Sequence, residues 1–172
     1  MSKHKIAAPV VGVVMGSDSD LEAVQGCMKT LKDLGIAHEV RVISAHRTPE
    51  AAQEFAKQAA GRGLRVIIAA AGGAAHLAGA LASLTPLPVI GIPIQTTGLG
   101  GLDSLLSTVQ MPSGVPVATV AIGRSGPVNA AVLAAQILGT ADPDVQARVQ
   151  AYKAKLAERV AIADENVRDA HA

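Results

Sequence analysis

A histidine and an arginine stand side by side in the run Ser44-Ala45-His46-Arg47-Thr48-Pro49, directly after the apolar stretch 40–43. An imidazole exchanges protons near neutral pH, and a guanidinium can grip a phosphate with two parallel N–H donors. His46 is therefore a candidate general acid or base, with a purely structural histidine as the alternative. Arg47, helped by the Ser44 hydroxyl, is a candidate phosphate ligand, unless it only pairs with a nearby carboxylate.

A second polar cluster, Gly16-Ser17-Asp18-Ser19-Asp20, follows the first apolar stretch, 10–15. The hydroxyl of Ser17 offers a short donor for an anion. Asp20 either places negative charge at the start of a helix or accepts hydrogen bonds from sugar hydroxyls. Because the carboxyl ends of parallel strands meet at one edge of a sheet, we predict that both clusters share one pocket for a phosphorylated small molecule.

Helix caps are the alternative to chemistry for two of these hydroxyls. Ser19-Asp20-Leu21-Glu22 has the pattern of a capping box, and Thr48 precedes a proline and an acid, as N-cap residues often do. We therefore predict that Ser19 and Thr48 cap helices.

A third segment of interest is the small-residue stretch 70–79, which contains Gly73, Ala74 and His76. Small residues let backbone N–H groups come close to a ligand, although tight packing between a strand and a helix explains them equally well. We predict that His76 either caps the following helix or lines the site.

Other site chemistries find little support in the sequence. His46 and His76 lack the further ligands that a metal needs, because the chain has no His-x-x-x-His pair and no cysteine pair, so we predict no metal. The turn 98–101 lacks the spacing of a dinucleotide fingerprint. Aromatic residues make up 1% of the chain, which argues against a flavin site. The single cysteine, Cys27, lies in a helical pattern and is predicted to be a core residue.

The elements that must position these residues follow from apolar periodicity. Apolar, β-branched runs without alternation predict parallel strands covered on both faces. These runs are 10–15, 40–43, 64–71, 88–93 and 116–122. Helical stretches are predicted near 21–34, 49–62, 74–83, 102–109 and 128–138. The order predicts a three-layer αβα fold of the α/β class, with a doubly wound, mainly parallel sheet of flavodoxin or Rossmann type.

Length and composition fit this architecture. The 172 residues suit a single domain, with a compact core at about 9–140, an extra C-terminal helix at about 143–160 and a frayed tail at 161–172. A net charge of +1 gives no reason to expect nucleic acid as a partner. The N-terminal residues 1–8 lack the apolar core of a secretory signal, and no run is long enough to span a membrane.

Two further expectations concern the compartment and the assembly. A lone cysteine suits a reducing cytoplasm. Hydrophobic residues make up 49% of the chain, more than a small monomer easily hides, which favours a homo-oligomer.

The chain resembles a known family, the class I N5-carboxyaminoimidazole ribonucleotide mutases of purine biosynthesis, also called the catalytic subunit of phosphoribosylaminoimidazole carboxylase. The resemblance runs from residue 10 to residue 138 and rests on five ordered motifs. They are Met15-Gly16-Ser17-Asp18-Ser19-Asp20, Ser44-Ala45-His46-Arg47-Thr48-Pro49, Gly72-Gly73-Ala74-Ala75-His76-Leu77, Asp103-Ser104-Leu105 with Val109-Gln110-Met111-Pro112, and Asn129-Ala130 with Leu133-Ala134-Ala135-Gln136-Ile137-Leu138.

The resemblance implies an isomerase that converts N5-carboxyaminoimidazole ribonucleotide into 4-carboxy-5-aminoimidazole ribonucleotide, without metal, ATP or organic cofactor. It implies that carbon dioxide is released and recaptured, with His46 moving the proton. Residues implied to bind the ribonucleotide or complete the pocket are Ser17, Asp20, Ser44, Arg47, Gly73, Ala74 and His76. The family is expected to assemble as an octamer.

A related class II enzyme carboxylates aminoimidazole ribonucleotide directly with carbon dioxide, and this reaction is the alternative. That class typically has Lys in place of Arg47 and lacks the Gly-Gly-Ala-Ala-His-Leu loop, so the chain looks like class I. Ala70 and Ala78 stand where the family usually has Gly and Pro. An alanine at position 70 would be strained if that position required a positive φ.

Overall fold

The computed structural model describes residues 8–171. Residues 1–7 lie outside the described residues. They make up most of the N-terminal segment 1–8, for which the sequence predicts no secretory signal. Among the helices of the described part, none is both long and apolar enough to cross a lipid bilayer.

A five-stranded, all-parallel sheet with the order β2-β1-β3-β4-β5 forms the centre of the molecule. The strands are β1 (Val11–Met15), β2 (His38–Val42), β3 (Val66–Gly72), β4 (Val89–Ile94) and β5 (Ala118–Thr119). The chain winds from β1 outward to β2 and then back across to β3, β4 and β5. The reversal lies between β1 and β3, and ligands of open α/β sheets bind at such a reversal.

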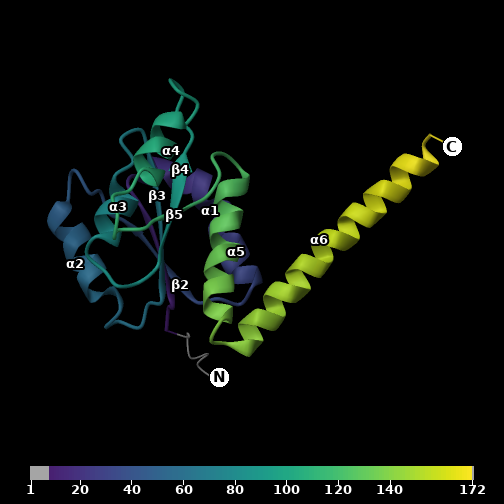
Figure 1. The fold of residues 1–172 in the computed structure, drawn as a ribbon, viewed down its shortest axis with the longest axis horizontal. Coiled ribbons are helices and arrows are strands. Elements are labelled where there is room, and N and C mark those ends of the chain that lie inside the picture. The colour runs from purple at the N-terminus through teal and green to yellow at the C-terminus, as the bar shows by residue number, and fades with distance from the viewer. Residues whose placement is uncertain (1–7, 172) are drawn as a thin grey trace, which may run out of the picture.

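Helices cover both faces of this sheet, as predicted (Figure 1). They are η1 (Asp18–Asp20), α1 (Leu21–Asp33), α2 (Pro49–Ala59), α3 (Leu77–Ala82), α4 (Leu102–Val109), α5 (Ser125–Gly139) and α6 (Pro143–Asp169). Successive residues of a strand point to opposite faces, so Ile68 packs with α1 and α5, whereas Ile67 packs with α2 and α3. Each side chain buried in this way contributes about 1.5–3 kcal/mol of transfer free energy.

The strand β2 departs from the prediction that every strand is covered on both faces. Val40 is 38% exposed and Val42 is 54% exposed. The physical reason is position, because β2 is an edge strand with a neighbour on one side only.

The C-terminal helix is longer than predicted, and the expected fraying from residue 161 is wrong for the described part of the tail. Helix α6 runs from Pro143 to Asp169, with the Asp142 side chain accepting hydrogen bonds from the amides of Asp144 and Val145. Between 144 and 169 the sequence contains neither Gly nor Pro, so nothing local ends the helix.

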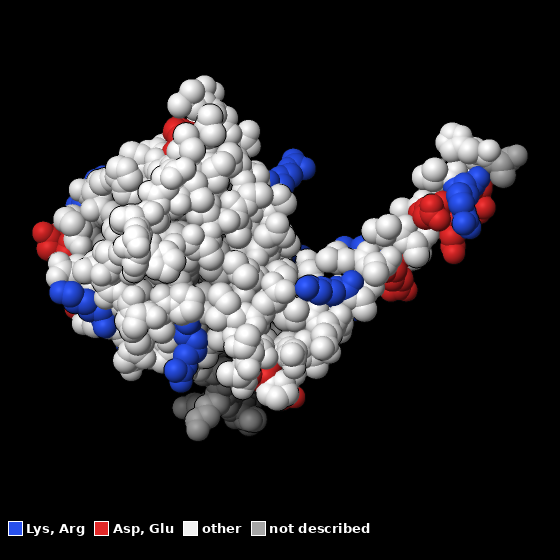
Figure 2. All heavy atoms as spheres, in the orientation of Figure 1, with Lys and Arg blue, Asp and Glu red and all other residues white. Residues whose placement is uncertain are grey.

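Only the first turns of α6 pack on the body of the molecule. Val145 and Val149 are buried against the core beside α5, while Val160 and Val167 are 69% and 60% exposed. The distal half projects away from the sheet (Figure 1), and charged side chains of both signs lie along it among uncharged ones (Figure 2).

Candidate active site

Three chain segments meet in a cavity of about 400 Å³ at the carboxyl ends of β1, β2 and β3. It lies at the reversal of strand order, where the sequence predicts the shared pocket. The predicted site residues that line it are Ser17, Asp20, Ser44, His46, Arg47 and Ala74. Gly73 and His76 are not among the lining residues described for this cavity, although both belong to the loop that forms its wall.

The two histidines of the site contact each other through their rings. The Nε2 atom of His46 lies 2.9 Å from the Nδ1 atom of His76, and the rings meet edge to face at 88°. At this distance the two rings form a hydrogen bond, in which one nitrogen donates and the other accepts according to the tautomer of each ring. His76 stands at the start of α3, but its side chain makes no cap hydrogen bond there. Of the two roles predicted for His76, the structure therefore favours a place beside the site, since its ring contacts His46, which lines the cavity.

Arg47 joins the first two polar clusters. One Nη of its guanidinium donates to the carbonyl oxygen of Gly16 at 2.9 Å, and its Nε lies 3.4 Å from the Oγ of Ser44. The three ion pairs among residues 8–171 involve other side chains. A guanidinium has five N–H donors in a planar fork, so donors beyond these two contacts can serve a ligand at the cavity.

The hydroxyls of Ser44 and Thr48 build the turn that presents His46. The Oγ of Ser44 accepts from the backbone N–H of Arg47 at 3.1 Å. The Oγ1 of Thr48 accepts from the Ser44 amide and donates to the Ser44 carbonyl. Thr48 occupies the N-cap position of α2 with Pro49 next to it, but its hydroxyl bonds to the turn and not to the helix.

Ser17, and not Ser19, supplies the cap at the end of β1. The Oγ of Ser17 accepts from the amide of Ser19 at 3.3 Å and begins the short helix η1. The predicted capping box therefore does not form, because η1 intervenes before α1 begins at Leu21.

Asp20 sits half-buried between η1 and α1 at the cavity. Burial raises the pKa of its carboxyl above the ordinary 3.8, a hydrogen bond with the Ser17 backbone lowers it, and the charge of Asp18 raises it again, with a net upward shift. Such a carboxylate is short of hydration, and hydroxyl donors from a ligand would relieve that shortage.

The loop after β3 holds its shape through one glycine. Gly73 has a φ of +67°, a conformation that L residues with a side chain rarely adopt. All the described residues with positive φ are glycines, so Ala70, inside β3, carries no such strain. The N–H of Gly73 donates to the Oγ of Ser104 at 2.9 Å.

Helix α4 supplies residues that the sequence analysis quoted only as a motif or did not consider. Ser104, Ser107 and Thr108 have hydroxyls within hydrogen-bond distance of backbone atoms in the loop 73–75. Their spacing of three and four residues, which places side chains on one face of a helix, was a signal that could have found them.

Two other expectations concern Cys27 and metal binding. Cys27 is fully buried in the core, and burial raises the pKa of its thiol to about 12, so it stays protonated at neutral pH. Within residues 8–171, no group of three or more His, Cys, Asp and Glu side chains is arranged to hold a metal ion.

Comparison with known proteins identifies the family. The model of the family described as AIR carboxylase matches residues 10–159. This chain belongs to the AIR carboxylase family. It is 57% identical, over 91% of its own length and 88% of the relative's, to the N5-carboxyaminoimidazole ribonucleotide mutase of Mycobacterium tuberculosis. It is 54% identical to the protein of the same name from Pyrococcus horikoshii, over 91% of this chain and 87% of that one.

Solved structures agree with this assignment to the AIR carboxylase family. The crystal structure of Treponema denticola PurE superposes with a TM-score of 0.83 at 30% sequence identity, covering 92% of this chain and 98% of that one. The predicted α/β fold and the predicted family are thus confirmed.

Proposed function

We propose that this AIR carboxylase family member is an N5-carboxyaminoimidazole ribonucleotide mutase, an isomerase of purine biosynthesis. It converts N5-carboxyaminoimidazole ribonucleotide into 4-carboxy-5-aminoimidazole ribonucleotide. The observation that carries the proposal is the contact of 2.9 Å between His46 and His76 beside a cavity lined by Ser17, Asp20 and Arg47. Relatives that carry the mutase name at 53–57% identity support the same reaction.

The reaction balances without a redox partner or a source of energy. The bond between the exocyclic nitrogen and the carboxyl carbon breaks and releases carbon dioxide, and that nitrogen takes a proton. The electron-rich ring carbon then attacks the carbon dioxide, forms the new carbon–carbon bond and loses its own proton. One proton enters and one leaves, so a single acid–base group can serve both steps.

His46 is that acid–base group in this proposal. An imidazole can donate a proton to the exocyclic nitrogen and later accept one from the ring carbon. The Nδ1 atom of His76 contacts the Nε2 atom of His46, so His76 can take up or return a proton when His46 changes its protonation state. A general acid or base of this kind typically contributes about 10²–10⁴-fold in rate.

The ribonucleotide is held by the polar edge of the cavity. Arg47 and Ser17 are assigned to the phosphate, since charge-assisted bonds to a guanidinium fork are strong and directional. Asp20 is assigned to the ribose hydroxyls, which would supply the donors that its half-buried carboxylate lacks. Ser44, Gly73 and Ala74 complete the pocket, and the small loop keeps carbon dioxide beside the ring at high effective concentration.

Homo-octameric assembly in the cytoplasm is also part of the proposal. Apolar side chains of α4 and of the distal half of α6 are exposed, including Leu102, Leu106 and Val160. Exposed apolar stripes on helices are typical of surfaces that a second subunit covers.

The first experiment offers the purified enzyme two substrates. We expect rapid conversion of N5-carboxyaminoimidazole ribonucleotide and little product from aminoimidazole ribonucleotide plus bicarbonate. Efficient carboxylation of the second substrate would instead show the direct carboxylase.

The second experiment tests the acid–base group. The substitution His46→Asn keeps a polar side chain of similar reach but cannot exchange protons. We expect conversion to fall by roughly 10²–10⁴-fold, with ribonucleotide binding, measured by calorimetry, largely retained. Wild-type turnover in this variant would refute the assigned role of His46.

A further inference from the structure

Three hydroxyls of α4 lie on the face that this helix turns toward the loop after β3. Ser104, Ser107 and Thr108 are spaced three and four residues apart, so they project from one side of the helix. Ser104 is completely buried and Thr108 is 2% exposed. The opposite side of α4 bears the exposed apolar residues Leu102 and Leu106. The buried face of α4 is thus the one with the hydroxyls, and the hydrogen bonds that they make explain why polar side chains are buried there.

Ser104 uses both of its hydrogen-bonding functions to join two segments. Its Oγ accepts from the N–H of Gly73 at 2.9 Å and donates to the carbonyl oxygen of Ile94, at the end of β4, at 2.7 Å. The single proton of this hydroxyl is donated to Ile94, and its oxygen accepts from Gly73, so one side chain serves both segments. Loss of this hydroxyl would leave a donor and an acceptor unpaired, and such groups are costly where water is excluded.

The other two hydroxyls contribute less to the loop. The Oγ of Ser107 donates to the carbonyl of Asp103 at 2.7 Å and lies 3.3 Å from the Gly73 carbonyl. The Oγ1 of Thr108 donates to the carbonyl of Ser104 at 2.7 Å and lies 3.5 Å from that of Ala75. Their short bonds remain inside α4, so Ser104 makes the strong link between the helix and the loop.

The helix itself is held in place at its first turn. The Oγ1 of Thr96 donates to the carboxylate of Asp103 at 2.9 Å and accepts from the N–H of Gly101 at 3.3 Å. The segment after β4 and the start of α4 therefore form one hydrogen-bonded unit. The loop that carries His76 is bonded to this unit through the amide of Gly73, only three residues before the imidazole.

We propose that Ser104 is a positioning residue, which fixes the loop 73–76 so that the His76 ring meets His46. The proposal rests on the proposed function in one respect, because the effect on turnover requires that the histidine pair moves the proton. Catalytic groups displaced by about 1 Å lose on the order of a hundredfold in rate. Ser104 touches neither histidine and acts only through Gly73.

The test is the substitution Ser104→Ala, with kcat, KM and the melting temperature measured together. We expect kcat to fall roughly tenfold to a hundredfold while KM changes less than threefold, because the phosphate and ribose contacts lie on other loops. The pH profile of kcat should shift as well, since the imidazole pair loses its geometry. Thr30→Val is the matched control, because the buried Thr30 hydroxyl bonds only to the Gly26 carbonyl of its own helix.

A second variant covers the case in which Ser104→Ala does not fold. Gly73→Ala acts on the other end of the same bond, and a Cβ there would meet no atom within 4 Å, so it strains only the loop backbone. We expect the same drop of kcat with little change of KM. Wild-type kcat in a folded Ser104→Ala enzyme overturns the proposal, as does an equal drop of kcat in Thr30→Val.

Nitrogen NMR shifts of the imidazole rings, measured without substrate, separate this inference from the proposed function. Changed ring shifts in Ser104→Ala, combined with full activity of His46→Asn, would remove the acid–base role proposed for His46 and leave the positioning role of Ser104 intact. Unchanged ring shifts in Ser104→Ala would remove the positioning role of Ser104, whatever the reaction is.

Discussion

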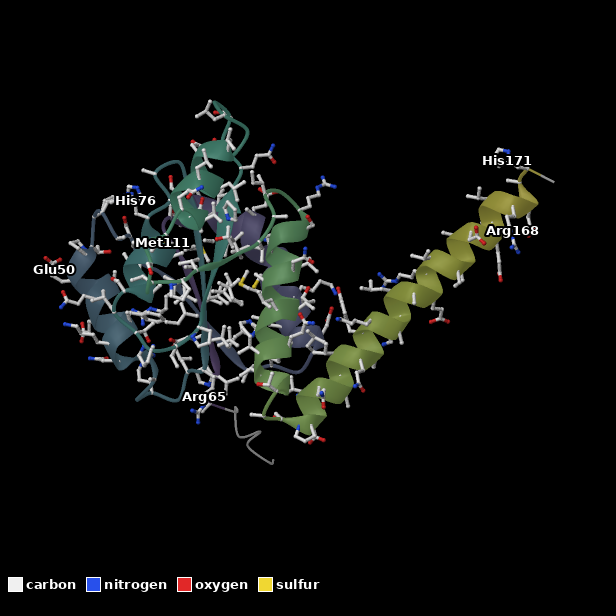
Figure 3. All side chains as sticks on the ribbon, viewed as in Figure 1. Glu50, Arg65, His76, Met111, Arg168 and His171 are labelled. Atoms are coloured by element: carbon white, nitrogen blue, oxygen red, sulfur yellow. The ribbon has the colours of Figure 1, made fainter. Side chains whose placement is uncertain are left out.

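Cavities lie at both ends of the parallel sheet, and the one lined by the predicted site residues is smaller than the one at the amino ends. At the carboxyl ends of the strands, about 400 Å³ is lined by hydroxyl, carboxylate, imidazole and guanidinium groups. At the amino ends, about 660 Å³ is lined largely by apolar side chains such as Ile36, Ile137 and Val145, together with Arg65 and Arg148. Figure 3 shows His76 and Arg65 near the two opposite ends.

The difference teaches that volume does not mark the site in this fold. In a parallel sheet, the loops and helix N-termini that follow the strands all lie at the carboxyl ends of the strands. Backbone N–H groups and polar side chains that can bind a ligand therefore converge at that end. At the amino end, Arg148 donates from its Nε to the carbonyl oxygen of Leu34 at 2.7 Å, which ties α6 to the end of α1. The guanidinium of Arg148 therefore contributes to the packing of α6 on the body of the molecule.

Of the substitutions that compare the two ends of the sheet, Arg47→Lys at the carboxyl end should change substrate binding most. Lysine keeps the charge but loses the planar fork that bonds Gly16 and Ser44 and that we propose grips the substrate phosphate. We expect KM for the ribonucleotide to rise roughly tenfold to a hundredfold, since hydrogen bonds to charged groups are worth about 1.5–3 kcal/mol. Steady-state kinetics with the mutase substrate measure it, and an unchanged KM would place the phosphate elsewhere.

A smaller effect on ribonucleotide binding is expected for Asp20→Asn. This substitution should change binding and thermal stability in opposite directions. The folded pKa of Asp20 lies above 3.8, so its contribution to stability is fully present below pH 3.8 and is lost as the pH rises through the folded pKa. The neutral amide avoids that loss.

At pH 7 we therefore expect a melting temperature equal to or above that of the wild type, together with roughly tenfold weaker ribonucleotide binding. The difference in melting temperature should shrink as the pH approaches 4. A variant that is less stable at pH 7 and binds normally would contradict both parts.

The smallest effect on turnover is expected at the other end of the sheet, from Arg148→Met. Methionine retains the apolar stem but leaves the Leu34 carbonyl without its donor. We expect a loss of about 1 kcal/mol in the free energy of unfolding, which is a few degrees in melting temperature for a chain of this size. Values of kcat and KM should match the wild type, and a fall in kcat would show that the amino end is coupled to the site.

Much of this fold was available from the sequence. Five apolar runs and the helical stretches between them predict the α/β order, because periodicity and caps are local properties. The clusters around Ser17 and His46 are also local, and the reversal of strand order brings them together as expected. The edge exposure of β2 was missed because it depends on which neighbours the strand lacks. The full extent of α6 was missed although its sequence carries a local signal, the absence of Gly and Pro from 144 to 169.

The sequence by itself determined the polar residues at the strand ends, the small-residue loop and the family to which they belong. Only the tertiary structure decided that His46 and His76, thirty residues apart, lie within hydrogen-bond distance, and that Ser104 bonds to the loop that carries His76. The physical reason is that a side-chain hydrogen bond forms within about 3 Å. No local pattern fixes such a distance between segments that meet only when the sheet and its helices have packed.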